Sequence, residues 1–171
     1  MPEPVFTELT ELITELTYGK GGQFNCLCRR VDGGAGVAPH LRIPSIWQLV
    51  SHINYWTEYD LQRIRGERPP YPARADESWP SSAVPADDAG WRQEVARFTP
   101  LLGAVAVLAN AAPEKLQQEV EAMHPAHEQQ SLSVLSVLWQ TVVHKSYHLG
   151  QIALLRRTLG AWPPPGGGDT W

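Results

Sequence analysis

The sequence is poor in cysteine, and it has no long run of apolar residues. Cys26 and Cys28 are the only cysteines among the 171 residues, and two thiols separated by a single residue rarely form a disulfide. No second cysteine pair is present to complete a zinc knuckle, so we interpret both side chains as ordinary reduced thiols. No apolar stretch approaches the ~20 residues needed to cross a bilayer, and we therefore expect no membrane partner.

An excess of basic charge is also absent. The 14 Lys and Arg residues are outnumbered by 18 Asp and Glu residues, which gives a net charge of -4 at pH 7. Nucleic-acid binding draws its affinity mainly from Lys and Arg that neutralise phosphates, so we expect no nucleic-acid partner. The chain has no Lys or Arg before Lys20, so the basic start of a secretory signal is missing. We expect the protein to be cytoplasmic.

Apolar residues recur at helical spacing in four segments of the chain. Apolar residues make up 43% and charged residues 19% of the sequence, which is typical of a single globular domain, here 1–171. Helices are predicted over 4–18, from the capping box Ser45–Gln48 up to Gly66, from about 88 to 110, and from about 131 to 159. A short accessory helix is predicted to start at Pro113. No segment shows sustained alternation of polar and apolar residues, so no sheet is predicted. The fold class is all-α, a four-helix bundle.

The connections between these helices differ in length and composition. Residues 21–40 are rich in Gly and are interpreted as a connection, and 122–130 as a loop. Residues 67–86 are rich in Pro, Ser and Ala and indicate a long surface crossover, which a bundle needs when two successive helices run parallel. Pro100 is expected to bend or locally break its helix. The tail 160–171 cannot be helical and is expected to pack on the bundle.

Three histidines occupy positions at which they could share a ligand. His144 and His148 are spaced i, i+4, so their rings leave one face of the last helix, where Gln140 and Gln151 make the surface polar. His52 lies on a polar stripe of the second helix. An H-x-x-x-H pair alone is a weak signal, because a histidine on an apolar helix is more often a hydrogen-bonded core residue. The presence of His52 on a second helix favours a metal site, but it does not decide between metal ligands and hydrogen-bonded core histidines.

The sequence segments around these histidines resemble those of a known family. "SIWQLVSHINYW" and, much later, "VLWQTVVHKSYHLGQIALLRR" are similar to the DinB/YfiT-like family of DinB-like metalloenzymes, as is the ending "WPPPGGGDTW". The resemblance implies a four-helix bundle with a crossover and, frequently, a homodimer. It also implies that His52, His144 and His148 hold one metal ion, with Gly150-Gln151-Ile152 following the last of them.

A site of three neutral imidazoles favours catalysis over a purely structural role. The remaining positions of the ion stay available to water or substrate, and a bound water would be acidified toward a pKa of ~7. The ligands suit a divalent transition metal and do not name it; zinc is the default, with nickel or iron as alternatives.

No general acid or base is assigned from the sequence, so the catalytic residues are unknown. Tyr55, Tyr147 and Gln151 are candidates for positioning, and each is equally explained as a packing residue. His124 and His127 could line the mouth of the pocket, although solvent-exposed loop residues are the simpler interpretation.

Two kinds of function fit these observations. The first is a metal-dependent enzyme acting on a small molecule, which the resemblance implies to be a hydrolase or an S-transferase using a low-molecular-weight thiol such as bacillithiol or mycothiol. The second is a non-catalytic, metal-stabilised binding or stress-associated protein, which the absence of an obvious acid or base favours. A polar core network without a metal is a third reading of the histidines.

Overall fold

The structure, a computed structural model, describes residues 43–121 and 131–162. The predicted helix 4–18, the connection 21–40, the loop 122–130 and most of the tail lie outside these ranges. The described elements are helices α3 (Ile46–Ile64), α4 (Asp88–Ala109), α5 (Pro113–Gln117) and α6 (Val134–Thr158), the 3-10 helix η2 (Ala75–Ser78), and strands β1 (Glu119–Glu121) and β2 (Ser131–Ser133).

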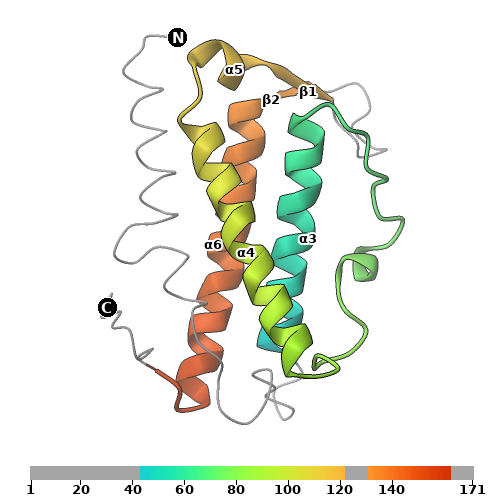
Figure 1. Cartoon of the computed structure of the whole chain (residues 1–171), viewed down its shortest axis with the longest axis vertical. Coiled ribbons are helices and arrows are strands. Elements are labelled where there is room, and N and C mark those ends of the chain that lie inside the picture. The colour runs from blue at the N-terminus through green and yellow to red at the C-terminus, as the bar shows by residue number, and fades with distance from the viewer. Residues whose placement is uncertain (1–42, 122–130, 163–171) are drawn as a thin grey trace.

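Three long helices pack together along the long axis of the molecule. Figure 1 shows α3 and α4 running in the same direction and α6 running against both, with α5 and the two strands at one end. Helix α3 packs against both α6 and α4. The segment between α3 and α4 travels back along the length of the bundle, as the predicted crossover requires. The all-α fold is therefore confirmed.

The core consists of two apolar clusters along the bundle. The cluster near the start of α3 is centred on Leu49, Ile53, Phe98, Leu102 and Ile152. The cluster at the opposite end contains Leu61, Val105, Leu116, Val137 and Val142. Full burial of one such side chain stabilises a fold by about 1.5–3 kcal/mol. Because these residues recur at helical spacing, they lie on one face of each helix, and that face packs inward.

Helix α3 begins where its capping box predicts. Ser45 Oγ accepts a hydrogen bond from the Gln48 backbone N–H at 3.2 Å, and Gln48 Oε1 accepts one from the Ser45 N–H at 3.1 Å. The same two side chains bind the crossover, because Ser45 Oγ also donates to the Ala83 carbonyl at 2.5 Å and Gln48 Nε2 donates to the Pro80 carbonyl at 3.1 Å. The start of α3 thus fixes the path of the crossover.

Glycines with positive φ follow two of the helices. Gly66 has φ +83° after α3, and Gly160 has φ +69° after α6. This left-handed conformation is one that glycine adopts at little cost, and both helices end at the glycines that the sequence indicates.

A small sheet is present where the sequence analysis predicted none. Strands β1 and β2 pair antiparallel, with Glu119 opposite Ser133 and Glu121 opposite Ser131. Each strand has three residues, too few for an alternating pattern to be visible. Because Ser131–Ser133 forms β2, helix α6 starts at Val134 and not at the expected 131, with Ser133 as its N-cap.

Pro100 lies inside α4 without breaking it, since α4 is assigned as continuous from Asp88 to Ala109. Pro100 is exposed, so the backbone carbonyl left without its N–H partner can be hydrated. The expected local break was wrong.

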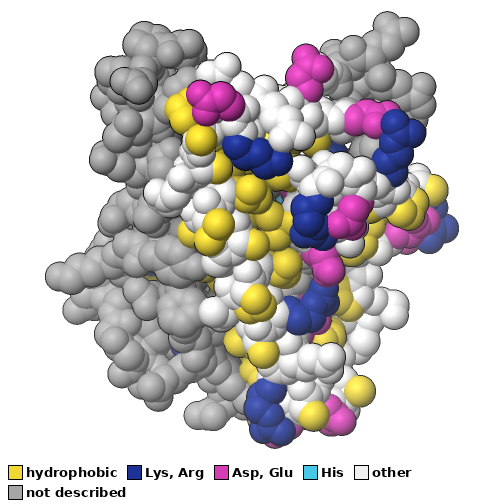
Figure 2. Space-filling view, turned by 45° about the horizontal axis from the view of Figure 1, so that its top comes forward, with side chains coloured by type: hydrophobic (Ala, Val, Ile, Leu, Met, Phe, Trp, Pro, Cys, Tyr) yellow, Lys and Arg dark blue, Asp and Glu magenta, His cyan; other side chains and the backbone are white. Residues whose placement is uncertain are grey.

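The described surface carries charges of both signs. On the face shown in Figure 2, Lys and Arg side chains lie beside Asp and Glu side chains, with apolar side chains between them. Among the helices of 43–121 and 131–162, none combines the length and apolarity that a membrane-crossing helix requires.

Candidate metal centre

The antiparallel packing of α3 against α6 brings three histidines together. His52 comes from the middle of α3, and His144 and His148 come from successive turns of α6. Each offers a ring nitrogen, and these nitrogens all lie within 4.8 Å of one another. The His52 ring is 5.2 Å from the His144 ring and 4.9 Å from the His148 ring, measured between centroids. Side chains from two elements and from distant parts of the sequence therefore converge on one point.

The two histidines of α6 face each other through their Nε2 atoms. The distance between His144 Nε2 and His148 Nε2 is 2.9 Å. A single proton can satisfy both nitrogens, which then act as donor and acceptor, and a metal ion can replace that proton by accepting a lone pair from each. This contact is the closest approach among the three rings that the structure gives.

Gln151 determines which nitrogen of His148 is free. Its Oε1 lies 2.7 Å from His148 Nδ1, and its Nε2 donates to Tyr147 Oη at 3.3 Å. Because the amide oxygen can only accept, His148 Nδ1 carries the proton, and the Nε2 lone pair points toward His144. A carbonyl-type acceptor behind a histidine is the usual support of a metal-binding imidazole.

The crossover supports His52 in a similar way. His52 Nδ1 lies 3.1 Å from the Ser78 carbonyl and 3.1 Å from Ser78 Oγ, while Ser78 Oγ donates its own proton to the Ala75 carbonyl at 2.9 Å. The Nδ1–H of His52 therefore points at Ser78, which leaves Nε2 as the unprotonated nitrogen. Trp79 stacks on the His52 ring at 3.8 Å with an interplanar angle of 13°, and its ring meets the edge of His148 at 5.7 Å.

Burial keeps the three imidazoles neutral. It lowers the pKa of His52 and that of His144 from 6.5 to about 4, and the nearby histidines add to this effect. Burial also lowers the pKa of His148, against the opposing effect of the hydrogen bond that its Nδ1–H donates to Gln151. A neutral imidazole is the form that coordinates a metal ion, so the site is in its ligating form at neutral pH.

The donor set fits a transition metal. In the described part of the chain, the contacts that hold the three rings come from Ser78, Trp79, Trp56, Tyr147 and Gln151, and no carboxylate or thiolate is among them. Three nitrogen donors leave further positions of a bound ion open, which is typical of catalytic and not of structural sites.

The other residues considered from the sequence have more ordinary positions. Gln140 is exposed, and Tyr55 lines a groove on a neighbouring face of α3. Gln151 and Tyr147 do contact the histidines, as described above. His124 and His127 lie outside the described residues.

Sequence reasoning missed three residues near the centre. Ser78 and Trp79 belong to the crossover, and the only signal there was a large aromatic residue within a stretch of Pro, Ser and Ala. Lys145 is almost completely buried beside His144, and burial lowers its pKa to about 7 against the attraction of Asp60. Lys145 is spaced four residues from both Thr141 and Leu149, which are buried on the inner face of α6, and this spacing was the available signal.

Comparison with known proteins supports the family that the histidines suggest. The family model described as the DinB superfamily matches residues 25–152, about three quarters of the chain. No curated protein and no solved structure matches the chain. The chain belongs to the DinB superfamily, and its helical fold and the three-histidine group agree with that membership.

Proposed function

We propose that the protein binds one divalent transition metal ion through His52, His144 and His148, and that it is a metal-dependent enzyme acting on a small molecule. The observation that carries the proposal is the convergence of three imidazoles whose ring nitrogens lie within 4.8 Å of one another. In His52 and His148, Nδ1 is held by Ser78 and Gln151, so both rings present Nε2. Zinc is the default metal, with nickel or iron as alternatives.

The residues of the chain have distinct tasks in this proposal. A bound ion supplies Lewis-acid polarisation and acidifies water, which are the usual contributions of an open three-histidine site. Ser78 and Gln151 keep two imidazoles in the ligating tautomer, and Trp79 covers one side of the His52 ring. Burial suppresses proton competition for the same nitrogens.

Two reactions use such a site, and an assay separates them. Hydrolysis needs only water, whereas S-transfer needs a low-molecular-weight thiol as co-substrate. The metal-loaded full chain is incubated with activated esters, amides and alkylating electrophiles, with and without bacillithiol or mycothiol. Turnover in water alone indicates a hydrolase, and turnover only with the thiol indicates a transferase. In both cases His148→Ala is expected to abolish turnover. If neither condition gives metal-dependent turnover, the enzymatic proposal is wrong.

A non-catalytic, metal-stabilised protein is the second candidate. It is favoured by the contacts of the three rings in the described ranges, which include no carboxylate to act as acid or base. Such a protein should lose stability on metal removal without losing any activity.

The exposed face of α6 supports the proposed homodimer. Four large apolar side chains at roughly helical spacing, 42% to 65% exposed, lie on this face: Trp139, Val143, Tyr147 and Leu154. An exposed apolar stripe of this kind often marks an interface. Light scattering should give twice the chain mass for the wild type and the monomer mass for Val143→Asp. A monomeric wild type would contradict the proposal.

A further inference from the structure

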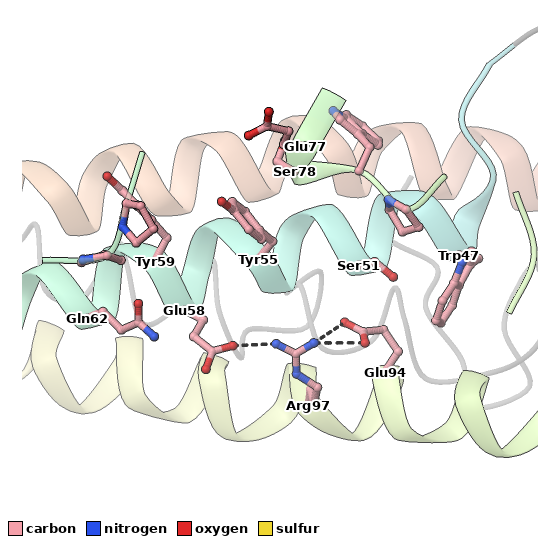
Figure 3. Close-up of a pocket in the computed structure, with 14 residues that line it drawn as sticks. Trp47, Ser51, Tyr55, Glu58, Tyr59, Gln62, Glu77, Ser78, Glu94 and Arg97 are labelled. Carbon is pink, nitrogen blue, oxygen red and sulfur yellow. Dashed lines mark hydrogen bonds and ion pairs between the residues drawn. The ribbon is translucent and has the colours of Figure 1, made fainter. Parts of the chain in front are cut away.

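A groove of about 550 Å³ lies beside the metal centre, between α3, the crossover and α4 (Figure 3). Its volume is in the range of small-molecule sites. None of the three histidines lines it. Ser78 and Trp79 line the groove and also contact His52, so they form the wall between the two sites.

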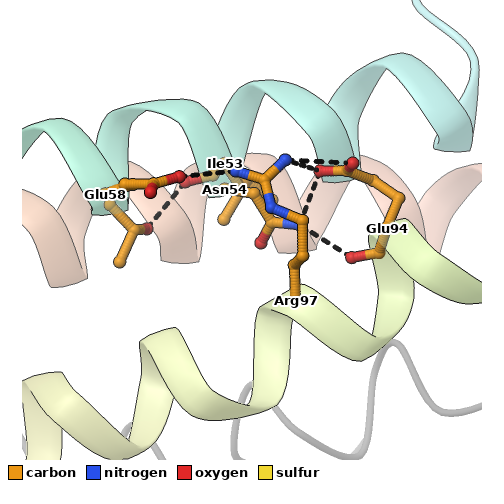
Figure 4. Close-up of polar contacts among 6 residues, drawn as sticks. Ile53, Asn54, Glu58, Glu94 and Arg97 are labelled. Carbon is orange, nitrogen blue, oxygen red and sulfur yellow. Dashed lines mark hydrogen bonds and ion pairs between the residues drawn. The ribbon is translucent and has the colours of Figure 1, made fainter.

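The charged residues of the groove leave an excess of negative charge. Among the described residues, three glutamates and one arginine line it, so two negative charges remain. Arg97 is already engaged, because it donates to Glu58 Oε2 at 2.6 Å and to Glu94 Oε1 and Oε2 at 3.1 Å each (Figure 4). Glu94 is held in turn by Asn54 Nδ2 at 2.8 Å. This network leaves the guanidinium little capacity to receive an anionic ligand.

Glu77 is the carboxylate with the weakest partners in the groove. Its cationic partner in the described part of the chain is Arg74, whose Nε is 3.9 Å away, and both side chains are exposed. Glu77 Oε2 accepts a hydrogen bond from the Ala73 backbone N–H at 3.0 Å. Its negative charge is therefore available to a cation that enters from solvent.

Aromatic rings form much of the remaining wall. Tyr55 and Tyr59 come from α3 and Trp79 from the crossover. Tyr59 is only 5% exposed, yet its hydroxyl has no hydrogen-bond partner among residues 43–121 and 131–162. An unsatisfied buried hydroxyl is costly, and a ligand N–H donor that reached it from the groove would satisfy it. Burial and the nearby Glu77 raise the pKa of Tyr55, which agrees with a neutral phenol facing a carboxylate.

We propose that this groove binds a small organic amine in its cationic form. Aromatic faces and carboxylates together recognise an alkylammonium group, because the ring quadrupole attracts the cation and the carboxylate accepts its N–H bonds. An anion would face the excess negative charge, and a purely apolar ligand would bury Glu58 and Glu77 without a new partner. The site uses no metal-ligating residue, so it does not depend on the proposed metal chemistry.

The test is calorimetric titration of the full chain, stripped of metal by a chelator, with the triamine spermidine as the probe. We expect saturable binding with one site per chain. Glu77→Gln should weaken it roughly tenfold, as for the loss of a charged hydrogen bond. Tyr59→Phe should weaken binding without lowering the unfolding midpoint, because the hydroxyl it removes has no partner in the described part of the chain. Glu114→Gln, an exposed change on α5 away from the groove, is the matched control and should bind like the wild type.

Three results would overturn the proposal. The first is the absence of saturable binding in the folded wild type. The second is equal weakening by Glu77→Gln and Glu114→Gln, which would place spermidine on the general acidic surface. The third is displacement of spermidine by magnesium chloride added at the same total cationic charge as spermidine. A diffuse negative potential alone would then explain the binding.

Discussion

Gln151 is the residue that most directly controls the orientation of a proposed ligand. It accepts the Nδ1–H of His148 at 2.7 Å, and its own amide is oriented by the Tyr147 hydroxyl. Supporting hydrogen bonds of this kind change metal affinity because they fix both the tautomer and the angle of the ring.

Replacing Gln151 by Leu should weaken metal binding by roughly 10- to 100-fold, the usual cost of losing such a partner. Competition with a chromophoric chelator measures the affinity. Gln151→Glu keeps an acceptor for the His148 Nδ1–H and should retain most of the metal affinity. Gln140→Leu, an exposed substitution on the same helix, is the control. Equal affinities for Gln151→Leu and Gln140→Leu would show that Gln151 does not support a ligand.

The lowered pKa values of the histidines predict how the metal-free protein responds to acid. The pKa of His52 is about 4 when folded and near 6.5 when unfolded, so the unfolded chain binds more protons between these values. Stability contributed by neutral His52 is therefore complete above pH 6.5 and lost as the pH falls toward 4, by about 3 kcal/mol in total.

Urea unfolding of the metal-free protein at pH 7.5, 6 and 5 measures this loss. His52→Gln removes the titrating group, so its stability should fall less over the same range than that of the wild type. Parallel pH dependences for the two proteins would mean that His52 is not a buried neutral histidine.

At the scale of elements, the start of α3 and the crossover depend on each other. Ser45 caps α3 and binds the Ala83 carbonyl, and Gln48 binds the Pro80 carbonyl. Immediately before Pro80 in the chain, Ser78 and Trp79 contact His52. One short segment thereby contributes to helix initiation and to the three-histidine cluster.

Ser45→Ala should lower the free energy of unfolding by about 1–2 kcal/mol, because it removes the helix cap together with a bond to the crossover. Denaturant unfolding measures the change, with Ser81→Ala at an exposed crossover position as the control. A loss no larger than that of Ser81→Ala would contradict the coupling between cap and crossover.

At the scale of the whole molecule, the sequence predicts what depends on local patterns. The capping box at Ser45 and the glycines at 66 and 160 determine helix ends through neighbouring residues alone, and these boundaries agree with the structure. The i, i+4 spacing of His144 and His148 determines their common face, and His52 joins them because α3 and α6 pack together.

Features that depend on tertiary contacts could not be predicted. The contact of Trp79 with His52 requires the actual path of the crossover, which no periodicity encodes. The pairing of Glu119–Glu121 with Ser131–Ser133 joins strands too short to show a pattern. The groove beside the centre likewise arises from three elements at once, so no single motif indicates it.

The central claim is that the three histidines hold one metal ion, and metal content tests it most directly. Elemental analysis is performed on protein purified without a His-tag or nickel column, for the wild type and for His148→Ala. The account predicts about one transition-metal ion per wild-type chain, as one three-histidine site implies, and little or none in the variant. A folded wild type that takes up no zinc, nickel or iron, even when supplied with each, would contradict it and leave a helical bundle with buried neutral histidines.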